Sequence, residues 1–190
     1  KLKSSENSSI TDLEVDGVFD DCQEMVKNAF LEETLKPHRN LTSANSINVA
    51  RWLPQSFYYF FAMQELIKRK VKNPIVFSVP SGNFGNICAG FIAKELGLPV
   101  SHFIASTNQN NTFPRYMESG KYVPQPSVQT ISNAMDVGNP SNFVRINKLF
   151  NKDLYRLKNV CSSYYFSDNE THKAIQEIYE SFSYIADPHG

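Results

Sequence analysis

The stretch that decides the fold is Ile75-Val76-Phe77-Ser78-Val79-Pro80-Ser81-Gly82-Asn83-Phe84-Gly85-Asn86. It begins as an apolar, β-branched run, a pattern typical of a strand buried on both faces. It continues through a loop of small residues into residues 87–96, which have the apolar spacing of a helix that ends at Gly97. A loop between a strand and a helix offers backbone N–H groups and a positive helix N-terminus to an anion, most often a phosphate.

The neighbouring segments predict the rest of the fold. A second strand is expected at residues 100–106, and strand, helix and strand within about thirty residues form a βαβ unit with parallel strands. A long helix kinked at Pro54 is expected upstream. Downstream, we expect an irregular segment at 122–142, a helix at 143–157, a strand at 164–166 and a helix at 168–184. The sequence therefore predicts an α/β fold with a parallel sheet and helices on both faces.

Composition narrows the class of function. The 190 residues carry 19 Lys and Arg against 19 Asp and Glu, so the net charge lacks the footprint of a nucleic-acid or polybasic membrane binder. The three cysteines are far apart and the four histidines show no metal-ligand spacing, which favours reduced thiols, a cytoplasmic location and no metal site. No apolar run approaches membrane-spanning length. Residues 1–9 are expected to be a linker or cut end, and residues 10–190 one α/β domain that binds a phosphate.

Two common phosphate motifs do not match the loop. A nucleotide P-loop needs Gly-Lys-Ser/Thr, whereas Gly120-Lys121 is followed by tyrosine. A dinucleotide site needs Gly-x-Gly-x-x-Gly and an acidic residue after the next strand, and neither is present. A compact phosphate, held by backbone amides and flanked by Ser81 and the asparagine side chains, fits better. An ordinary glycine-rich turn remains the alternative from the loop alone.

The loop at residues 81–86 resembles the phosphate-binding loop of fold-type II pyridoxal-phosphate enzymes, which are related to the tryptophan synthase β subunit. Further stretches, in the same order along the chain, are similar to the threonine synthase family. They are residues 16–23, Ser43-Ala44-Asn45-Ser46-Ile47-Asn48-x-x-Arg51, Val79–Asn86, Ser132-Asn133-Ala134-Met135-Asp136-Val137 and Asp187-Pro188-His189. The resemblance implies the conversion of O-phospho-L-homoserine and water to L-threonine and phosphate, with pyridoxal phosphate as cofactor.

The resemblance also implies roles for individual residues. The cofactor phosphate is expected at Ser81, Gly82, Asn83, Phe84, Gly85 and Asn86. The candidates for substrate binding are Asn45, Ser46, Asn48, Arg51, Asn133 and Asp136. Arg51 suits a substrate phosphate because a guanidinium matches its oxygens in bidentate fashion, and a surface position on a helix is the alternative. Asn133 and Asp136 either shape the cleft or cap their own loop.

The chain departs from the family pattern at the catalytic lysine. The family's Schiff-base lysine lies in a Phe-Lys-Asp motif, and no Phe-Lys-Asp occurs in these residues; Lys152-Asp153 lies in the wrong region. We therefore expect no catalytic residue in this chain, the lysine upstream of it, and a partner in the remainder of the same polypeptide. The expectation is a central piece of a longer enzyme, inactive alone.

Two other functions stay open at this point. One is another fold-type II lyase, such as a serine or threonine dehydratase. The other is a non-catalytic domain that binds a phosphorylated metabolite. A Phe-Lys-Asp motif upstream of Lys1 would favour threonine synthase over both.

Overall fold

The computed structural model describes residues 14–45 and 48–190. They fall into two compact units, Lys1–Asn40 and Leu41–Gly190. In the first unit, α1 spans Phe19–Leu31, and the Val18 N–H donates to Asp21 Oδ2 at 2.8 Å, which satisfies one backbone donor at the start of the helix. The linker expected at residues 1–9 lies outside the described residues, and the domain boundary at residue 10 stays a prediction.

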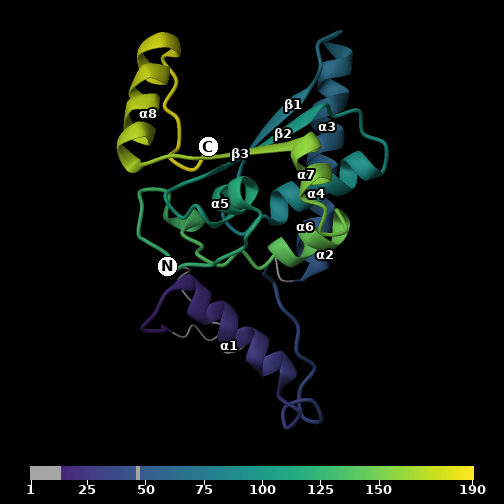
Figure 1. Ribbon diagram of the computed structural model, residues 1–190, viewed down its shortest axis with the longest axis vertical. Helices are drawn as coiled ribbons and strands as arrows, with labels where there is room; N and C mark the ends of the chain where they lie inside the picture. The colour runs from purple at the N-terminus through teal and green to yellow at the C-terminus, as the bar shows by residue number, and fades with distance from the viewer. Residues whose placement is uncertain (1–13, 46–47) are drawn as a thin grey trace, which may run out of the picture. The chain divides into compact units, whose positions relative to one another are not determined.

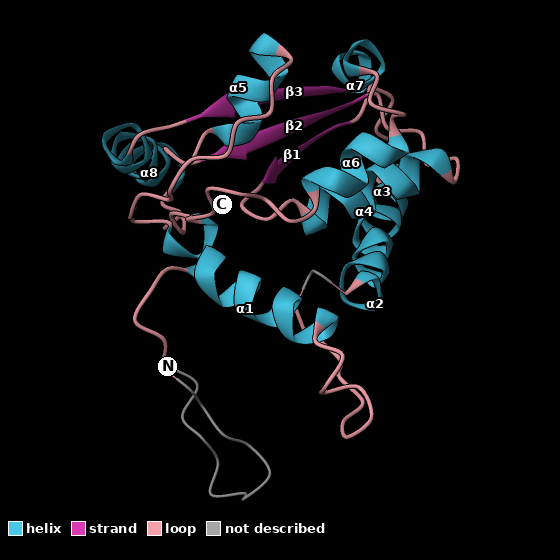
Figure 2. Ribbon diagram, turned by 60° about the horizontal axis from the view of Figure 1, so that its bottom comes forward, coloured by secondary structure: helices cyan, strands magenta, loops and turns pink. Residues whose placement is uncertain are grey.

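The second unit is built on a parallel sheet of three strands. They are β1 (Val76–Pro80), β2 (His102–Thr107) and β3 (Cys161–Tyr165), side by side in that order (Figures 1 and 2). Val76 lies opposite His102, and Phe103 lies opposite Cys161. Helix α4 (Gly85–Glu95) connects β1 to β2. The βαβ unit and the parallel sheet predicted from the sequence are confirmed.

The core lies on the sheet face that carries Phe77 and Phe103. Tyr59 of α3 (Ser56–Lys68) places its ring centroid 5.0 Å from that of Phe77 and 5.9 Å from that of Phe103. Phe91 of α4 lies 5.1 Å from Phe103. Gly90 allows this approach, because a Cβ there would come within 2.7 Å of the Phe103 ring. Helices α3 and α4 therefore cover one face of β1 and β2.

The opposite face of the sheet is more exposed than the sequence predicts. Successive side chains of a strand alternate between faces, so Val76 shares its face with Ser78 and Tyr164. Val76 is 48% exposed and Tyr164 is 54% exposed. The expectation that β1 is buried on both faces is wrong for the described residues. Helices α3 and α4 cover only the face that carries Phe77, and the face that carries Val76 is exposed.

Two breaks in the helices follow from local sequence. Pro54 ends α2 (Val49–Trp52), and a 3₁₀ turn, η1 (Leu53–Gln55), leads into α3, so the kink is confirmed. The single helix expected at 143–157 is wrong, because two helices, α6 (Phe143–Leu149) and α7 (Leu154–Val160), occupy this region. Asn151 and Lys152 between them have positive φ angles of 55° and 58°, which a continuous helix excludes.

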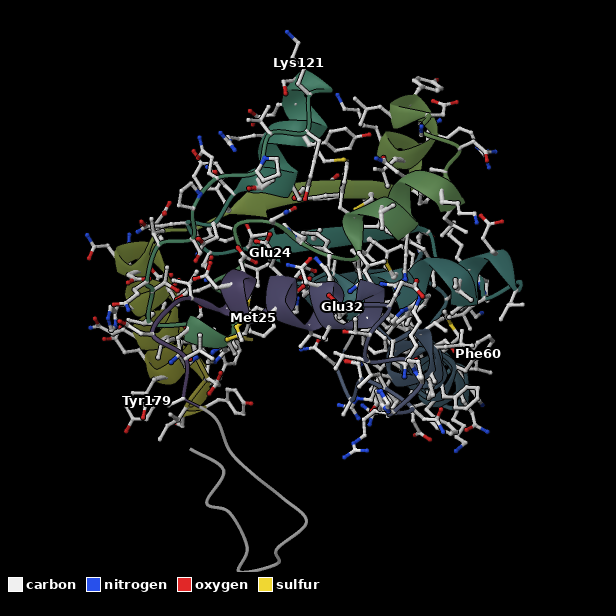
Figure 3. The ribbon with its side chains drawn as sticks, turned by 90° about the horizontal axis from the view of Figure 1, so that it is seen from below. Glu24, Met25, Glu32, Phe60, Lys121 and Tyr179 are labelled. Atoms are coloured by element: carbon white, nitrogen blue, oxygen red, sulfur yellow. The ribbon has the colours of Figure 1, made fainter. Side chains whose placement is uncertain are left out.

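The irregular segment predicted at residues 122–142 and the helix predicted at residues 168–184 lie close to their predicted places, and helix α5 (Thr112–Ser119) precedes them. Helix α5 ends at Gly120, whose φ is 72°, and Lys121 beyond it points outward (Figure 3). The irregular segment contains only a 3₁₀ turn among its described elements, η2 (Asn133–Met135). Helix α8 (Asp168–Phe182) begins with a capping box of Ser167 and Glu170. No helix in the described part of the chain is long and apolar enough to cross a membrane.

Candidate functional site

The loop after β1 is fixed at its start by Ser81. The Ser81 N–H donates to the Ser106 carbonyl at 2.8 Å, which extends the pairing of β1 with β2 by one residue. The Ser81 hydroxyl donates to the Val79 carbonyl at 2.9 Å, and the side chain is buried. These bonds hold the entry to the loop, which we call the cradle (residues 81–86), at the carboxyl end of the sheet.

Phe84 turns the cradle into helix α4. Its φ of 62° and ψ of 15° lie in the left-handed region, which is rare for a bulky side chain and costs roughly 1–2 kcal/mol. The ring is buried and lies 4.5 Å from the Phe113 ring, so packing holds the residue in this conformation. The strained turn is therefore supported by the core rather than by the loop itself.

The cradle presents main-chain donors at a helix N-terminus. Within the described residues, the N–H groups of Gly82, Phe84 and Gly85 donate to no acceptor of the protein. The first N–H groups of a helix lack intrahelical partners, and the helix dipole adds a partial positive charge there. This set of donors fits a phosphate group, which accepts several hydrogen bonds and carries negative charge.

The polar side chains of the cradle brace the loop. Asn83 Oδ1 accepts hydrogen bonds from the Ser141 N–H at 2.6 Å and from the Ser141 hydroxyl at 2.9 Å. Asn86 Nδ2 donates to the Pro80 carbonyl at 2.7 Å, and Asn86 Oδ1 accepts from the Ile87 N–H. These contacts hold Asn83 and Asn86 to neighbouring protein groups. That the two side chains also flank a phosphate stays a prediction.

Gly82 is required because another segment lies against it. A Cβ at Gly82 would come within 2.8 Å of Met135 Cα, closer than non-bonded carbons approach. The structure thus brings together two of the stretches singled out in the sequence, the cradle and residues 132–136. They are about fifty residues apart in the chain.

Asp136 anchors residues 132–136 to the end of β2. Its Oδ1 accepts hydrogen bonds from Asn108 Nδ2 at 2.9 Å, Asn110 Nδ2 at 3.1 Å and Thr130 Oγ1 at 2.7 Å. Its Oδ2 accepts from the Thr130 N–H at 3.0 Å. With four donors on one carboxylate, the geometry supports the loop-capping alternative for Asp136.

His189 joins the same segment from the far end of the chain. Its Nδ1 lies 2.7 Å from Asp187 Oδ1, and its Nε2 accepts from the Ala134 N–H at 3.3 Å. Hydrogen bonds from the backbone and side chain of His189 lower the pKa of Asp187. An acceptor role for Nε2 places the imidazole proton on Nδ1, facing the carboxylate.

A cavity of about 230 Å³ opens at the carboxyl ends of the three strands. It is lined in part by Pro80, Ser106, Met135, Phe166 and His189, which come from the strand ends and the segments just described. Ligands of open parallel sheets bind at this edge. No residue of the cradle lines this cavity, and Met135, which lies against Gly82, connects the two. We take the cradle, residues 132–136 and the adjacent cavity together as the candidate site.

The other predicted site residues that the structure describes do not line the cavity. Asn48 caps α2 by accepting from the Ala50 N–H at 3.0 Å, and Arg51 is exposed and does not line the cavity. Asn45 is half-buried in the turn before α2, and Ser46 lies outside the described residues. Asn133 is exposed and lies two residues before Met135, which contacts Gly82. Substrate contacts by these residues stay predictions.

Sequence reasoning missed the residues that hold the site together. Asn108 and Asn110 are buried at the end of β2, and Asn142, which is fully buried, donates from Nδ2 to the Asn83 carbonyl at 2.8 Å. Asparagines that directly follow a predicted parallel strand were a usable signal for the first two. Asn142 gave no local signal, because its partner lies 59 residues away.

Cys88, Cys161 and Tyr59 are buried in the core. Burial raises the pKa of Cys88 and of Cys161 to about 12, which keeps both thiols protonated and poorly nucleophilic. Burial also raises the pKa of Tyr59, whose hydroxyl donates to the Asn86 carbonyl at 2.8 Å. In the described residues no group of three or more His, Cys, Asp or Glu side chains is placed to hold a metal ion.

Comparison with known proteins gives a consistent result. No protein-family model matches the chain. A threonine synthase from Serratia marcescens is 45% identical over 189 residues, which is 100% of this chain and 43% of that protein. The threonine synthase structure from Escherichia coli superposes with a TM-score of 0.85 at 44% identity, covering 92% of this chain and 40% of that one. The PLP-bound threonine synthase from Brucella melitensis gives 0.82 at 33% identity, over 98% and 45%.

The chain resembles threonine synthases over its whole length and has the fold of the matched part of their structures. It spans about two fifths of the length of the curated relatives that it matches, 43% in the Serratia protein. The resemblance noted in the sequence motifs and the α/β fold are both confirmed.

Proposed function

We propose that this chain is part of a pyridoxal-phosphate-dependent threonine synthase, which converts O-phospho-L-homoserine and water to L-threonine and phosphate. We propose further that the cradle holds the cofactor's phosphate. The observation that carries this is that the N–H groups of Gly82, Phe84 and Gly85, at and just before the start of α4, have no acceptor among the described residues, in a chain similar to threonine synthases along its full length. That a related threonine synthase contains PLP supports the choice of cofactor.

The residues of this chain have a binding and positioning role in the proposal. The N–H groups of Gly82, Phe84 and Gly85 donate to the phosphate, and the dipole of α4 favours its charge. Met135, packed on Gly82, closes one side of the cradle. When bound, pyridoxal phosphate supplies an electron sink for negative charge beside the substrate's reacting carbons.

The proposal assigns the covalent attachment of the cofactor to another part of the polypeptide. No Phe-Lys-Asp motif is present in the 190 residues, so the Schiff-base lysine is expected upstream, in the remainder of the same chain. We therefore propose that this chain alone is catalytically inactive and that O-phospho-L-homoserine binds between it and that remainder. Cytoplasmic function is part of the proposal, supported by three free cysteines.

The test uses the intact protein expressed from its complete coding sequence and purified with pyridoxal phosphate. With O-phospho-L-homoserine, L-threonine and phosphate should appear in equal amounts. As the matched control, the lysine of the upstream Phe-Lys-Asp motif is replaced by alanine, which should abolish both products. Absence of that motif from the complete sequence would contradict the proposal before any assay.

Each alternative function has its own signature in the same assay. Release of ammonia from L-serine or L-threonine, without phosphate release from O-phospho-L-homoserine, would replace the proposal with a dehydratase. Binding of a phosphorylated metabolite with no turnover of any of these substrates would replace it with a non-catalytic domain. Either result would overturn the threonine synthase assignment.

A further inference from the structure

Asn142 contacts the peptide group that joins Asn83 to Phe84, on the side opposite to the Phe84 N–H. Its side chain is fully buried at the start of α6. Asn142 Nδ2 donates to the Asn83 carbonyl at 2.8 Å, and Asn142 Oδ1 accepts from Arg145 Nη1 at 2.5 Å. The two bonds fix the orientation of the amide, since a guanidinium only donates and a carbonyl only accepts.

The bond to Asn83 controls a donor of the cradle through the geometry of the peptide. The Asn83 carbonyl and the Phe84 N–H belong to the same planar trans peptide group, so they point in opposite directions. A hydrogen bond that holds the carbonyl toward Asn142 therefore holds the Phe84 N–H away from it. That N–H is one of the cradle donors with no acceptor in the described protein.

The peptide group between Asn83 and Phe84 needs this support because Phe84, which follows it, has a strained backbone conformation. Phe84 is in the left-handed region, with φ of 62°, and a bulky residue there readily relaxes unless neighbouring groups hold it. Ser141 holds the Asn83 side chain and Asn142 holds the Asn83 main chain. Arg145, which orients Asn142, lies with its guanidinium carbon 5.8 Å from the centre of the Trp52 ring, so α6 and α2 both contribute to the arrangement.

We infer that Asn142 is a positioning residue for phosphate binding, which directs the Phe84 N–H into the cradle without touching the ligand. The inference rests on the proposed function, because it takes the phosphate of pyridoxal phosphate as the ligand. It predicts that cofactor affinity depends on the donor character of one buried amide rather than on its size or its link to Arg145.

The experiment replaces Asn142 by aspartate in the intact protein. Asn142→Asp keeps the side-chain shape and the oxygen that Arg145 contacts, but it sets a carboxylate oxygen against the Asn83 carbonyl in place of a donor. The matched control is Asn147→Asp on the same helix, which makes the same change of charge and retains an acceptor for the Tyr116 hydroxyl. Thermal unfolding of each variant checks that the fold is kept.

Two readouts are taken, neither of which is enzyme activity. The dissociation constant of pyridoxal phosphate should rise about tenfold or more in Asn142→Asp, because the hydrogen bond from the Phe84 N–H to the charged phosphate is lost. In Asn147→Asp it should change less than about threefold. In the cofactor-free protein, inorganic phosphate should shift the Phe84 amide resonance in the wild type and the control but not in Asn142→Asp. If Asn142→Asp does not fold, Asn142→Ser, too short to reach Asn83, is measured in the same way.

The outcomes separate this inference from the proposed function. Equal cofactor affinity and an equal Phe84 shift in wild type and Asn142→Asp would overturn the positioning role while leaving the cofactor site intact. Failure of the wild-type protein to bind either pyridoxal phosphate or inorganic phosphate would overturn the proposed cofactor site itself. Loss of affinity in both aspartate variants would assign the effect to charge and would also overturn the positioning role.

Discussion

Gly82 and Met135 are in direct contact at the mouth of the cradle, and a Cβ on Gly82 would lie 2.8 Å from Met135 Cα. This contact joins the strand–loop–helix stretch to residues 132–136, which are tied in turn to the end of β2 through Asp136. The cradle is therefore shaped as much by this distant segment as by its own glycines.

Gly82→Ala should separate the cradle from Met135 and weaken cofactor binding. The added methyl group meets backbone rather than a movable side chain, and overpacking of this kind costs about 1–3 kcal/mol. The dissociation constant of pyridoxal phosphate, measured by titration of the intact protein, should rise. Adding Met135→Ala should not rescue the variant, because the clash with the Met135 Cα remains. Rescue by Met135→Ala would contradict the backbone contact described here.

Asp136→Asn should destabilise the segment that covers the cradle. In asparagine one of the two carboxylate oxygens becomes an NH₂ group, which cannot accept these hydrogen bonds. At the Oδ1 position the NH₂ group would face the donors of Thr130, Asn108 and Asn110, and at the Oδ2 position it would face the Thr130 N–H. The free energy of unfolding should fall by about 2 kcal/mol, the order of a hydrogen bond to a charged group. Chemical denaturation of the intact protein measures it.

The control for Asp136 is its exposed neighbour. Asn133→Ala should leave the free energy of unfolding within about 0.5 kcal/mol of the wild type, as most surface substitutions do. Equal stability of Asp136→Asn and Asn133→Ala would sink the anchoring role of Asp136. A loss of substrate affinity without a loss of stability in Asn133→Ala would support its predicted substrate contact.

His189 should be needed for its acceptor nitrogen. Glutamine places its side-chain oxygen near the position of Nε2, where the Ala134 N–H donates, whereas asparagine reaches only the position of Nδ1 near Asp187. Hydrogen exchange of the Ala134 amide should therefore be close to wild type in His189→Gln. It should be about fivefold faster in His189→Asn, the effect of losing one hydrogen bond of about 1 kcal/mol. The same rate in both variants would contradict this contact.

The two buried thiols should be protected from alkylation in the native protein. Because burial raises the pKa of Cys88 and Cys161 to about 12, the reactive thiolate is scarce at pH 8, and both side chains are inaccessible. Cys22, which is half-buried, should react faster. Peptide mapping by mass spectrometry after iodoacetamide treatment at pH 8 distinguishes the sites, and denatured protein should react at all three. Rapid native alkylation of Cys88 would contradict the packing of α4.

The sequence predicts those parts of the fold that depend on local pattern. Each element of the β1–α4–β2 unit, the break at Pro54 and the helix at residues 168–184 follow from the pattern of their own residues and direct neighbours. The single helix expected at residues 143–157 was wrong because Asn151 and Lys152 adopt a left-handed turn that the apolar spacing does not reveal. Burial of both faces of β1 was wrong because exposure depends on what packs against the sheet.

In the candidate site, too, local sequence predicts one part and tertiary contacts determine the other. The cradle was found from its own glycines and the strand before it, whereas the protein partners of its side chains were not. Asn83 and Asn86 were expected to flank a phosphate, which stays a prediction, and their amides bind Ser141 and Pro80. Such partners come from tertiary contacts, and Asn83 and Ser141 are separated by 58 residues. Spacing in one sequence carries no information on that pairing.

The most direct test of the account is a crystal structure of the intact protein grown with pyridoxal phosphate. The account predicts the cofactor's phosphate within hydrogen-bond distance of the N–H groups of Gly82, Phe84 and Gly85, with the Asn83 and Asn86 side chains still bound to Ser141 and Pro80. A phosphate held elsewhere, with these three N–H groups facing solvent or another part of the protein, would contradict it.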